Sequence, residues 1–209
     1  MIIAIDGSAA SGKGTLAKRL ATHLGLSHLD TGALYRAVGL QLLNAGQGPK
    51  NINENQVVKA CVELDITLTT SPLIRSEKVA EIASVVAAMP AVRAALLALQ
   101  RQFAATPPYP KGAILDGRDI GTVVLPHADF KFFIDADINT RAERRTKELL
   151  QAGQSVMFRD VLSDMQERDC RDRSRSAAPL RPADDAINID TSSMDADDVL
   201  ALALSHITP

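Results

Sequence analysis

Residues 2–15 read Ile-Ile-Ala-Ile-Asp-Gly-Ser-Ala-Ala-Ser-Gly-Lys-Gly-Thr, and this stretch decides the fold. Its first four residues form a short apolar run, which is typical of a strand buried on both faces of a parallel sheet. The run stops at Asp6, and a glycine-rich loop follows. Apolar residues then recur every three or four positions over about 13–24, which predicts a helix. The chain therefore opens with a strand, a glycine-rich loop and a helix.

The glycine-rich loop fits the G-x-x-x-x-G-K pattern of a phosphate-binding P-loop, in the required place between a strand and a helix. Glycines let successive backbone N–H groups turn inward, and the new helix adds unpaired N–H groups and the positive end of its dipole. Lys13 then places a charge against the β- and γ-phosphates of a nucleotide. The alternative is an ordinary tight turn with a solvated lysine. The residues predicted to bind the nucleotide here are Gly7, Ser8, Ala9, Ala10, Ser11, Gly12, Lys13, Gly14 and Thr15.

The residue after Lys13 departs from the usual pattern, which has a Ser or Thr there to bind Mg²⁺. Gly14 stands in that place and Thr15 follows it. Because glycine has no hydroxyl, we expect Mg²⁺ to be held mainly by nucleotide phosphates and water, with no metal site built from protein side chains. Asp116, at the end of a predicted strand, is the best carboxylate for an outer-sphere role toward that ion, and a loop-capping role is the alternative.

The alternation of strands and helices continues along the chain. Further short apolar runs predict strands at 27–29, 113–116, 130–134 and 186–190. A helix over 138–151 and another near the C-terminus lie between or after these strands. Strands that alternate with helices predict an α/β fold with a parallel sheet covered by helices on both faces.

The segment of about 45–110 has a different pattern. It reads as a mostly helical insertion, with two helices interrupted near Pro90. Val62, Leu64, Ile66 and Leu68 alternate with polar residues, which predicts one strand with a solvated face. We therefore expect a single domain whose core comprises 1–44 and 111–209.

Composition and charge exclude several classes of protein. The 209 residues are 46% hydrophobic and 23% charged, which is ordinary for a globular chain. A net charge of −2 and 3% aromatic residues argue against a nucleic acid polymer as partner. No apolar run approaches the ~18 residues of a membrane-spanning helix, and the start lacks the basic region of a signal peptide. The two cysteines, Cys61 and Cys170, lack metal-type spacing and favour a cytoplasmic location.

The positive charge is nonetheless uneven, because six of the fifteen arginines lie between Arg159 and Arg181. Arginine binds phosphates and carboxylates through two parallel hydrogen bonds, so this clustering favours recognition of such groups over a merely solvated surface. An alternative for the alternation of arginine and aspartate over 168–175 is a helix covered by local salt bridges.

Three further stretches carry a resemblance to a known family. They read Asp30-Thr31-Gly32-Ala33-Leu34-Tyr35-Arg36, Asp116-Gly117-Arg118-Asp119-Ile120-Gly121-Thr122-Val123-Val124 and Arg168-Asp169-Cys170-Arg171-Asp172-Arg173-Ser174-Arg175. With the P-loop, they closely resemble the bacterial cytidylate kinases, over nearly the whole chain. The resemblance implies the P-loop nucleoside monophosphate kinase fold, with a five-stranded parallel sheet and an Arg-rich lid at about 153–176. It implies transfer of the γ-phosphoryl group of ATP to CMP or dCMP, with Mg²⁺ as cofactor, by a monomer.

The resemblance also implies roles for particular residues. The acceptor phosphate would be held by Thr31, Arg36 and Arg118, and the predicted catalytic residues are Lys13, Arg36 and Arg118. The cytosine would be surrounded by Ser84, Arg93, Asp119 and Arg175, with Arg168 and Asp172 at the ribose. Arg141 and Arg145 would reach the adenine and the phosphates of ATP, and the alternative is a solvated helix face with Glu143 and Glu148 as partners.

The chemistry of cytosine agrees with this division. Its O2 and N3 accept hydrogen bonds and its exocyclic amine donates, so its site needs arginine donors together with a carboxylate or hydroxyl acceptor. Uracil reverses the polarity at two ring positions, so UMP is expected to be the poorer substrate. The sequence departs from the family in having Thr31 where a serine is usual, and in a shorter segment at 65–74 than the family's β-rich insertion.

Two other functions remain open at this stage. The first is a P-loop kinase for another small acceptor, namely UMP, AMP, dTMP or shikimate. The second is a nucleotide-hydrolysing switch module, which is disfavoured because the chain contains no Asn-Lys-x-Asp motif of the kind that reads guanine.

Overall fold

The computed structural model describes residues 1–207 and contains one sheet of five parallel strands. The strands are β1 (Ile2–Gly7), β2 (Ser27–Asp30), β3 (Ala113–Gly117), β4 (Phe130–Asp135) and β5 (Ile187–Asp190). Their order in the sheet is β2-β3-β1-β4-β5, and every pairing is parallel. The predicted five-stranded parallel sheet is confirmed, and β1 lies at its centre.

The sheet is buried on both faces because the side chains of β1 alternate between two layers of helices. Ile3 and Ile5 pack with α1 (Lys13–Leu24) and α8 (Ala196–Ile207) on one face. Ala4 faces the other way, toward the cluster that includes Ala104 of α5 (Pro90–Ala105). A strand covered on both faces reads as the continuous apolar run seen in the sequence.

The helical region between β2 and β3 is built on α2 (Thr31–Asn44). Asp30 caps this helix, because its carboxylate accepts the backbone N–H of Ala33 at 3.1 Å. The region continues with α3 (Glu54–Val62), the short 3₁₀ turns η1 (Ile66–Thr70) and η2 (Pro72–Arg75), α4 (Glu77–Val86) and α5. The prediction of two helices interrupted near Pro90 is confirmed, because α4 ends shortly before this proline and α5 begins at it.

The strand predicted from the alternation of Val62, Leu64, Ile66 and Leu68 is wrong. Val62 ends α3 with 77% of its surface exposed, and Ile66 begins η1. The carboxylate of Asp65 accepts the backbone N–H of Thr67 at 2.9 Å, which starts the 3₁₀ turn. Alternation predicts a strand only where a neighbouring strand can pair with it, and none of the described strands lies beside these residues.

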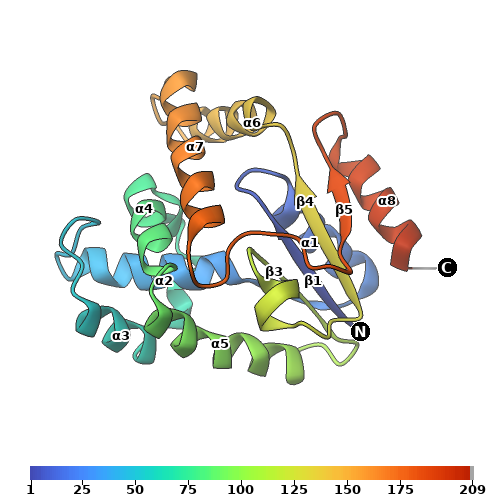
Figure 1. Ribbon diagram of the computed structural model, residues 1–209, viewed down its shortest axis with the longest axis horizontal. Helices are drawn as coiled ribbons and strands as arrows, with labels where there is room; N and C mark the ends of the chain where they lie inside the picture. Colours follow the sequence, from blue (N-terminus) through green and yellow to red (C-terminus); the bar gives the residue numbers. More distant parts are fainter. Residues whose placement is uncertain (208–209) are drawn as a thin grey trace.

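Helices α6 (Ile138–Gln151) and α7 (Phe158–Ser174) lie beyond the carboxyl ends of the strands, as Figure 1 shows. They pack on each other through Ala142, Leu149, Val161 and Met165. The carboxyl end of α7 returns to the sheet, whereas its amino end projects away from it (Figure 1). The Arg-rich segment is therefore brought over the edge of the sheet where the P-loop begins.

Among residues 1–207, no single helix has the length and hydropathy needed to cross a membrane. Helices α4 and α5 meet that criterion only when taken together, and they are bent by 98° at the break between them.

Gly7, the last residue of β1, shows why the turn into the P-loop needs a glycine. A Cβ atom at this position would lie 1.9 Å from the carbonyl oxygen of Ile134 on the neighbouring strand. We expect Gly7→Ala to lower the free energy of unfolding by ~3 kcal/mol or more, measured by urea denaturation, since backbone cannot yield as a side chain can. Gly153→Ala is the matched control. It also has a positive φ, but no atom lies within 4 Å of its Cβ position, so a similar loss there would contradict the steric explanation.

Candidate functional site

The P-loop forms a turn whose backbone N–H groups are free at the start of α1. Ala10 and Gly12 adopt the left-handed conformation, with φ of 57° and 91°. Gly12 caps α1 without any side-chain hydrogen bond, so the first N–H groups of the helix have no capping partner. The hydroxyls of Ser8 and Ser11 are buried, and neither has a hydrogen-bond partner among the described residues. Such a turn is suited to bind an anion.

Two side chains hold the P-loop from outside through its carbonyl groups. Thr191, directly after β5, donates its hydroxyl to the carbonyl of Ser11 at 2.9 Å. Arg141 of α6 donates to the carbonyl of Ala9 at 3.3 Å. Because the carbonyls are engaged on the outside, the N–H groups are left to face the opposite side of the loop. The loop is thereby organised before any ligand arrives.

Lys13, the first residue of α1, lies in a site of mostly positive charge. Burial, and secondarily the nearby guanidinium of Arg118, lower the pKa of its ammonium to about 8, with the carboxylate of Asp116 opposing both effects. Lys13 forms no ion pair with the residues that the structure describes. A buried cation without a partner is one that an anionic ligand stabilises.

The pKa of Lys13 predicts proton uptake on nucleotide binding. Above about pH 8 the free protein loses the Lys13 proton, and a bound polyphosphate raises the pKa and restores it. The dissociation constant of Mg²⁺·ATP is therefore expected to rise with pH above 8, and calorimetry in buffers of different ionisation enthalpy should detect net proton uptake there. In Lys13→Met this uptake should disappear. Uptake that persists in Lys13→Met would assign the titration to another group.

A second cluster of charged side chains lies around Asp119, just after β3. Its carboxylate forms ion pairs with Arg93 of α5 and with Arg175 at the end of α7, the latter at 3.8 Å. Burial raises the pKa of Asp119 above its ordinary value, and the two guanidinium groups oppose this shift. The phenol of Tyr35 faces the same three charges. The structure thus brings together three of the four residues predicted to surround the cytosine.

Between this cluster and the P-loop, the positive charges of Arg118, Arg36 and Arg168 converge. Arg118 is paired with Asp172, its Nε lying 2.9 Å from the carboxylate. Burial and the repulsion of neighbouring arginines together lower the pKa of Arg168 to about 9 and that of Arg36 to about 10, and burial is the larger cause in both cases. Repulsion of this kind predicts a polyanionic ligand that neutralises several cations at once.

Several buried polar atoms of this region lack a hydrogen-bond partner within the described part of the chain. They are the hydroxyl of Ser84, Nε of Arg168 and Nη2 of Arg175. Buried polar groups are almost always hydrogen-bonded, so three atoms without a hydrogen bond among the residues predicted to bind CMP indicate a place for a polar ligand, and Nη2 of Arg175 has only the longer ion pair with Asp119.

The contact of Thr31 with the acceptor phosphate stays a prediction, because its hydroxyl proton is engaged within the protein. Thr31 Oγ1 donates to the backbone carbonyl of Asp116 at 2.8 Å. A Cβ atom on Gly117 would lie 2.6 Å from Thr31 Oγ1, so the glycine provides the room for this contact. In this geometry the threonine joins α2 to β3, and a hydrogen bond to a phosphate would require rotation of its hydroxyl.

The two arginines of α6 that are predicted to bind ATP differ in burial and in their partners. Arg141 is 3% exposed, so the solvated helix face proposed as its alternative is wrong. It contacts Asp169 at 2.6 Å besides the P-loop carbonyl of Ala9. Arg145 is half-buried and pairs with Glu148 at 3.2 Å, which is one of the local partners named in the alternative. Contact of either residue with ATP stays a prediction.

Asp116 lies beside the glycine that replaces the usual metal-binding hydroxyl. Its Oδ2 is 3.7 Å from the position that a Cβ on Gly14 would take, so the carboxylate faces the start of α1. Its Oδ1 lies 2.7 Å from Nε2 of His28. Within residues 1–207, no group of three or more His, Cys, Asp or Glu side chains could hold a metal ion. The outer-sphere role of Asp116 toward Mg²⁺ stays a prediction.

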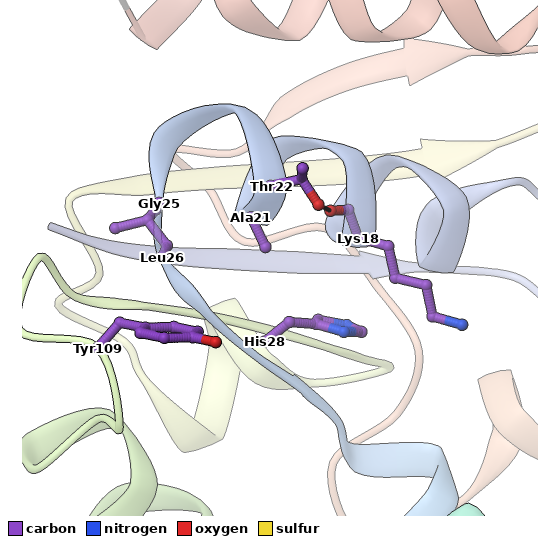
Figure 2. A pocket seen from close by; sticks show the side chains of 7 residues that line it. All are labelled: Lys18, Ala21, Thr22, Gly25, Leu26, His28 and Tyr109. Carbon is purple, nitrogen blue, oxygen red and sulfur yellow. Dashed lines mark hydrogen bonds between the residues drawn. The ribbon is translucent and has the colours of Figure 1, made fainter.

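A cavity of about 470 Å³ lies beside the carboxyl half of α1, away from the P-loop (Figure 2). Lys18 and Thr22 line it from α1, and His28 and Tyr109 line it from below the helix in this view. It contains none of the residues predicted to bind a nucleotide. The residues predicted to bind nucleotides lie instead in the charged region between the P-loop and Asp119.

A P-loop at the carboxyl end of a central parallel strand, facing a second cationic site under an Arg-rich helix, defines a P-loop kinase. Residues 3–209 match the family model for cytidylate kinase, and the chain belongs to that family.

Relatives agree with this assignment in sequence, and a solved structure agrees with it in fold alone. The chain is 53% identical to a cytidylate kinase of Paramagnetospirillum magneticum (strain ATCC 700264 / AMB-1), over 99% of this chain and 97% of that protein. It is 54% identical to a cytidylate kinase of Rhodopseudomonas palustris (strain BisB18), over 99% and 95% of the two chains. An uncharacterized protein from Eubacterium ventriosum ATCC 27560 shares the fold, with a TM-score of 0.54 at 16% identity over 99% and 98% of the chains.

Sequence reasoning assigned no role to three residues that the structure places at the site. Tyr35 lies within the Asp30–Arg36 stretch, so its place in that motif could have indicated that it belongs to the site, where it faces Arg93, Asp119 and Arg175. His28 precedes the same motif, but only the pairing of β2 with β3 brings it to Asp116. The third is Asp6, whose partners lie more than a hundred residues away in sequence.

Proposed function

We propose that this protein transfers the γ-phosphoryl group of ATP to CMP or dCMP, giving ADP and CDP or dCDP. The observation that carries the proposal is the arrangement of two cationic sites on one edge of the sheet. One is a P-loop with free N–H groups and an unpaired Lys13, and the other is the buried cluster of Arg93, Asp119 and Arg175. The names of the relatives support CMP as the acceptor at the second site.

The transfer is a single in-line displacement without a covalent enzyme intermediate. A phosphate oxygen of CMP attacks the γ-phosphorus, and the bond from that phosphorus to the bridging oxygen of ADP breaks. Little bond chemistry is left to side chains, so positioning and neutralisation of charge dominate catalysis. Lys13 stabilises the donor phosphates, while Arg36 and Arg118, with Thr31, hold the acceptor phosphate.

Mg²⁺ is proposed as the cofactor, supplying further neutralisation of the donor phosphates when bound with ATP. Asp116, beside Gly14, would hold such an ion through water rather than directly. The remaining P-loop residues bind the phosphates through their N–H groups, and Arg141 and Arg145 contact the adenine and the phosphates of ATP.

The acceptor base is recognised by opposed hydrogen-bonding groups. Arg93 and Arg175 donate to O2 and N3 of cytosine, and Asp119 and Ser84 accept from its amine, which gives hydrogen-bond partners to the Ser84 hydroxyl and to Nη2 of Arg175. Arg168 and Asp172 contact the ribose. Uracil would present acceptors and donors in the reverse places, so UMP is the weaker acceptor.

The chain divides into a core of 1–44 and 111–209, an acceptor-binding insertion of about 45–110 and a lid of about 153–176. Closure of the lid excludes water that would otherwise hydrolyse ATP. We further propose a cytoplasmic monomer. Both cysteines are free, which agrees with a reducing compartment.

The test is ADP production from Mg²⁺·ATP with CMP, dCMP, UMP, AMP, dTMP or shikimate offered separately, with the second product identified by chromatography. We expect fast turnover with CMP and dCMP, slow turnover with UMP, and little with the others. Equal ADP release with and without an acceptor would refute the kinase and indicate a nucleotide-hydrolysing module. A preference for another acceptor would keep the phosphotransferase and refute the cytosine site.

A further inference from the structure

Asp6, the penultimate residue of β1, makes two long-range contacts that no function described so far uses. Its carboxylate is 3% exposed. Oδ1 accepts the backbone N–H of Ile120 and Oδ2 accepts that of Gly121, each at 2.7 Å. These two residues begin η3 (Ile120–Val124), a short turn directly after Arg118 and Asp119. Both oxygens of one carboxylate therefore hold the start of that turn.

Asp6 also contacts the chain just before Arg118 and Asp119. In the sheet, Asp6 is the parallel partner of Gly117, the last residue of β3. Gly117 pairs with Asp6 in the sheet, and Ile120 donates its N–H to the Asp6 carboxylate. Arg118 and Asp119 are the two residues between these contacts. Asp6 is itself followed by Gly7, the first residue of the P-loop. One residue thereby connects the loop for the donor phosphates to the segment assigned to the acceptor.

We propose that Asp6 is a positioning residue that fixes Arg118 and Asp119 relative to the P-loop, and so sets the distance and orientation between acceptor and donor. The inference rests on the proposed assignment of Arg118 and Asp119 to CMP. Asp6 itself touches neither substrate; it acts through the backbone of the β3–η3 loop.

The chemistry of the contact requires a carboxylate. Two N–H donors converge on Asp6, and asparagine would offer one oxygen acceptor and one amide that is itself a donor. Burial raises the pKa of Asp6 to about 7, and the two backbone N–H bonds oppose that shift. Asp119 faces Asp6 with like charge and Arg118 with opposite charge. An uncharged residue would be easier to bury at this position than an acid. The presence of Asp6 therefore indicates that both of its carboxylate oxygens are needed as acceptors.

A second charged group packed on the same turn offers a matched control. The stem of Lys131 lies 3.3 Å from the Cβ position of Gly121, and its ammonium is engaged by Asp185 at 2.7 Å. Asp185→Asn therefore perturbs a charge packed around the same turn without touching the two N–H bonds. Its carboxylate is mostly exposed, so this variant should fold.

The experiment compares the KM values for CMP and ATP in wild type, Asp6→Asn and Asp185→Asn, at a pH above the pKa of Asp6. Misplacement of catalytic groups by a fraction of an ångström to 1 Å costs up to ~10²-fold, so Asp6→Asn should raise the KM for CMP ~10-fold or more while changing that for ATP less than ~3-fold. Asp185→Asn should leave both values near wild type. Equal shifts for the two substrates in Asp6→Asn, or no shift in a folded variant, would overturn the proposal.

Amide hydrogen exchange provides a readout that does not depend on the variant folding. In wild type, the N–H groups of Ile120 and Gly121 should exchange slowly with or without CMP, because Asp6 holds them in both states. In a folded Asp6→Asn, faster exchange should be confined to 118–124. Exchange of these two amides in wild type at the rate of an open loop would overturn the proposal. Absence of CMP-dependent activity in wild type would instead refute the proposed function, so the two failures are distinguishable.

Discussion

Replacing Lys13 by alanine is expected to lower kcat ~10²-fold or more, which corresponds to a loss of a few kcal/mol of transition-state stabilisation. The structure gives the physical reason. The ammonium lies at the start of α1 with no ion-pair partner among the described residues, and its pKa is lowered to about 8 by burial and by Arg118. Bound phosphates compensate this charge, which no ion pair within the described residues does, and the phosphate charge shifts during the transfer. Steady-state kinetics with Mg²⁺·ATP and CMP measures the effect.

The stability of the same variant separates catalysis from folding. Removing an unpaired buried cation relieves its desolvation, so the melting temperature of Lys13→Ala should stay unchanged or rise. Lys18→Ala, on the exposed side of the same helix, is the control and should keep kcat near wild type. Near-normal turnover in Lys13→Ala would refute the role assigned to Lys13, whatever its stability.

The second large effect is expected for Arg118→Met, with a loss of ~10²–10³-fold in kcat/KM for CMP and little change in the KM for ATP. Arg118 donates from Nε to Asp172 and from Nη1 to the carbonyl of Gly117, so among the described residues only its Nη2 makes no hydrogen bond and is left for a ligand. Its charge also lowers the pKa values of Lys13 and Arg168, so it lies between the donor and acceptor sites. A methionine keeps an unbranched apolar side chain in place of the arginine stem but neutralises no phosphate.

Arg118→Met also leaves the carboxylate of Asp172 unpaired, which should lower the melting temperature. Arg19→Met is the control. It removes an exposed ion pair between Arg19 of α1 and Asp197 of α8, and its kinetics should stay near wild type. Introducing Asp172→Asn into Arg118→Met should recover stability without recovering activity. Recovery of activity in the double variant would mean that Arg118 acts only through the fold.

The elements that the sequence predicts well are those whose signal is local. The run Ile2–Ile5, the glycines of the P-loop and the apolar spacing over 13–24 lie next to one another, and the structure confirms β1 and α1. The helix over 138–151 is also confirmed with the same bounds. The strand over Val62–Leu68 is wrong because alternation is a local signal for a structure that depends on a non-local partner.

Within the site, residue types were predictable but their partners were not. The sequence indicates that Arg93, Arg118, Asp119 and Arg175 belong to a phosphate- or base-binding site through the stretches that contain them or through the family resemblance. It does not indicate that Asp119 pairs with Arg93 and Arg175, or that Arg118 pairs with Asp172, because these pairs join residues 26 to 56 positions apart. Arg141 shows the consequence. Its sequence context suits a solvated helix face, whereas α7 and the P-loop bury it.

The sequence by itself determined the P-loop, the parallel α/β class and the family, because a glycine pattern, a buried apolar run and short motifs act over neighbouring residues. The tertiary structure decided which charges meet. It placed Asp6 against Ile120 and Gly121 across more than a hundred residues, and His28 against Asp116 through the pairing of β2 with β3. Electrostatic contacts depend on distance in space and on exclusion of water, and both are set only when the sheet brings the carboxyl ends of its strands together.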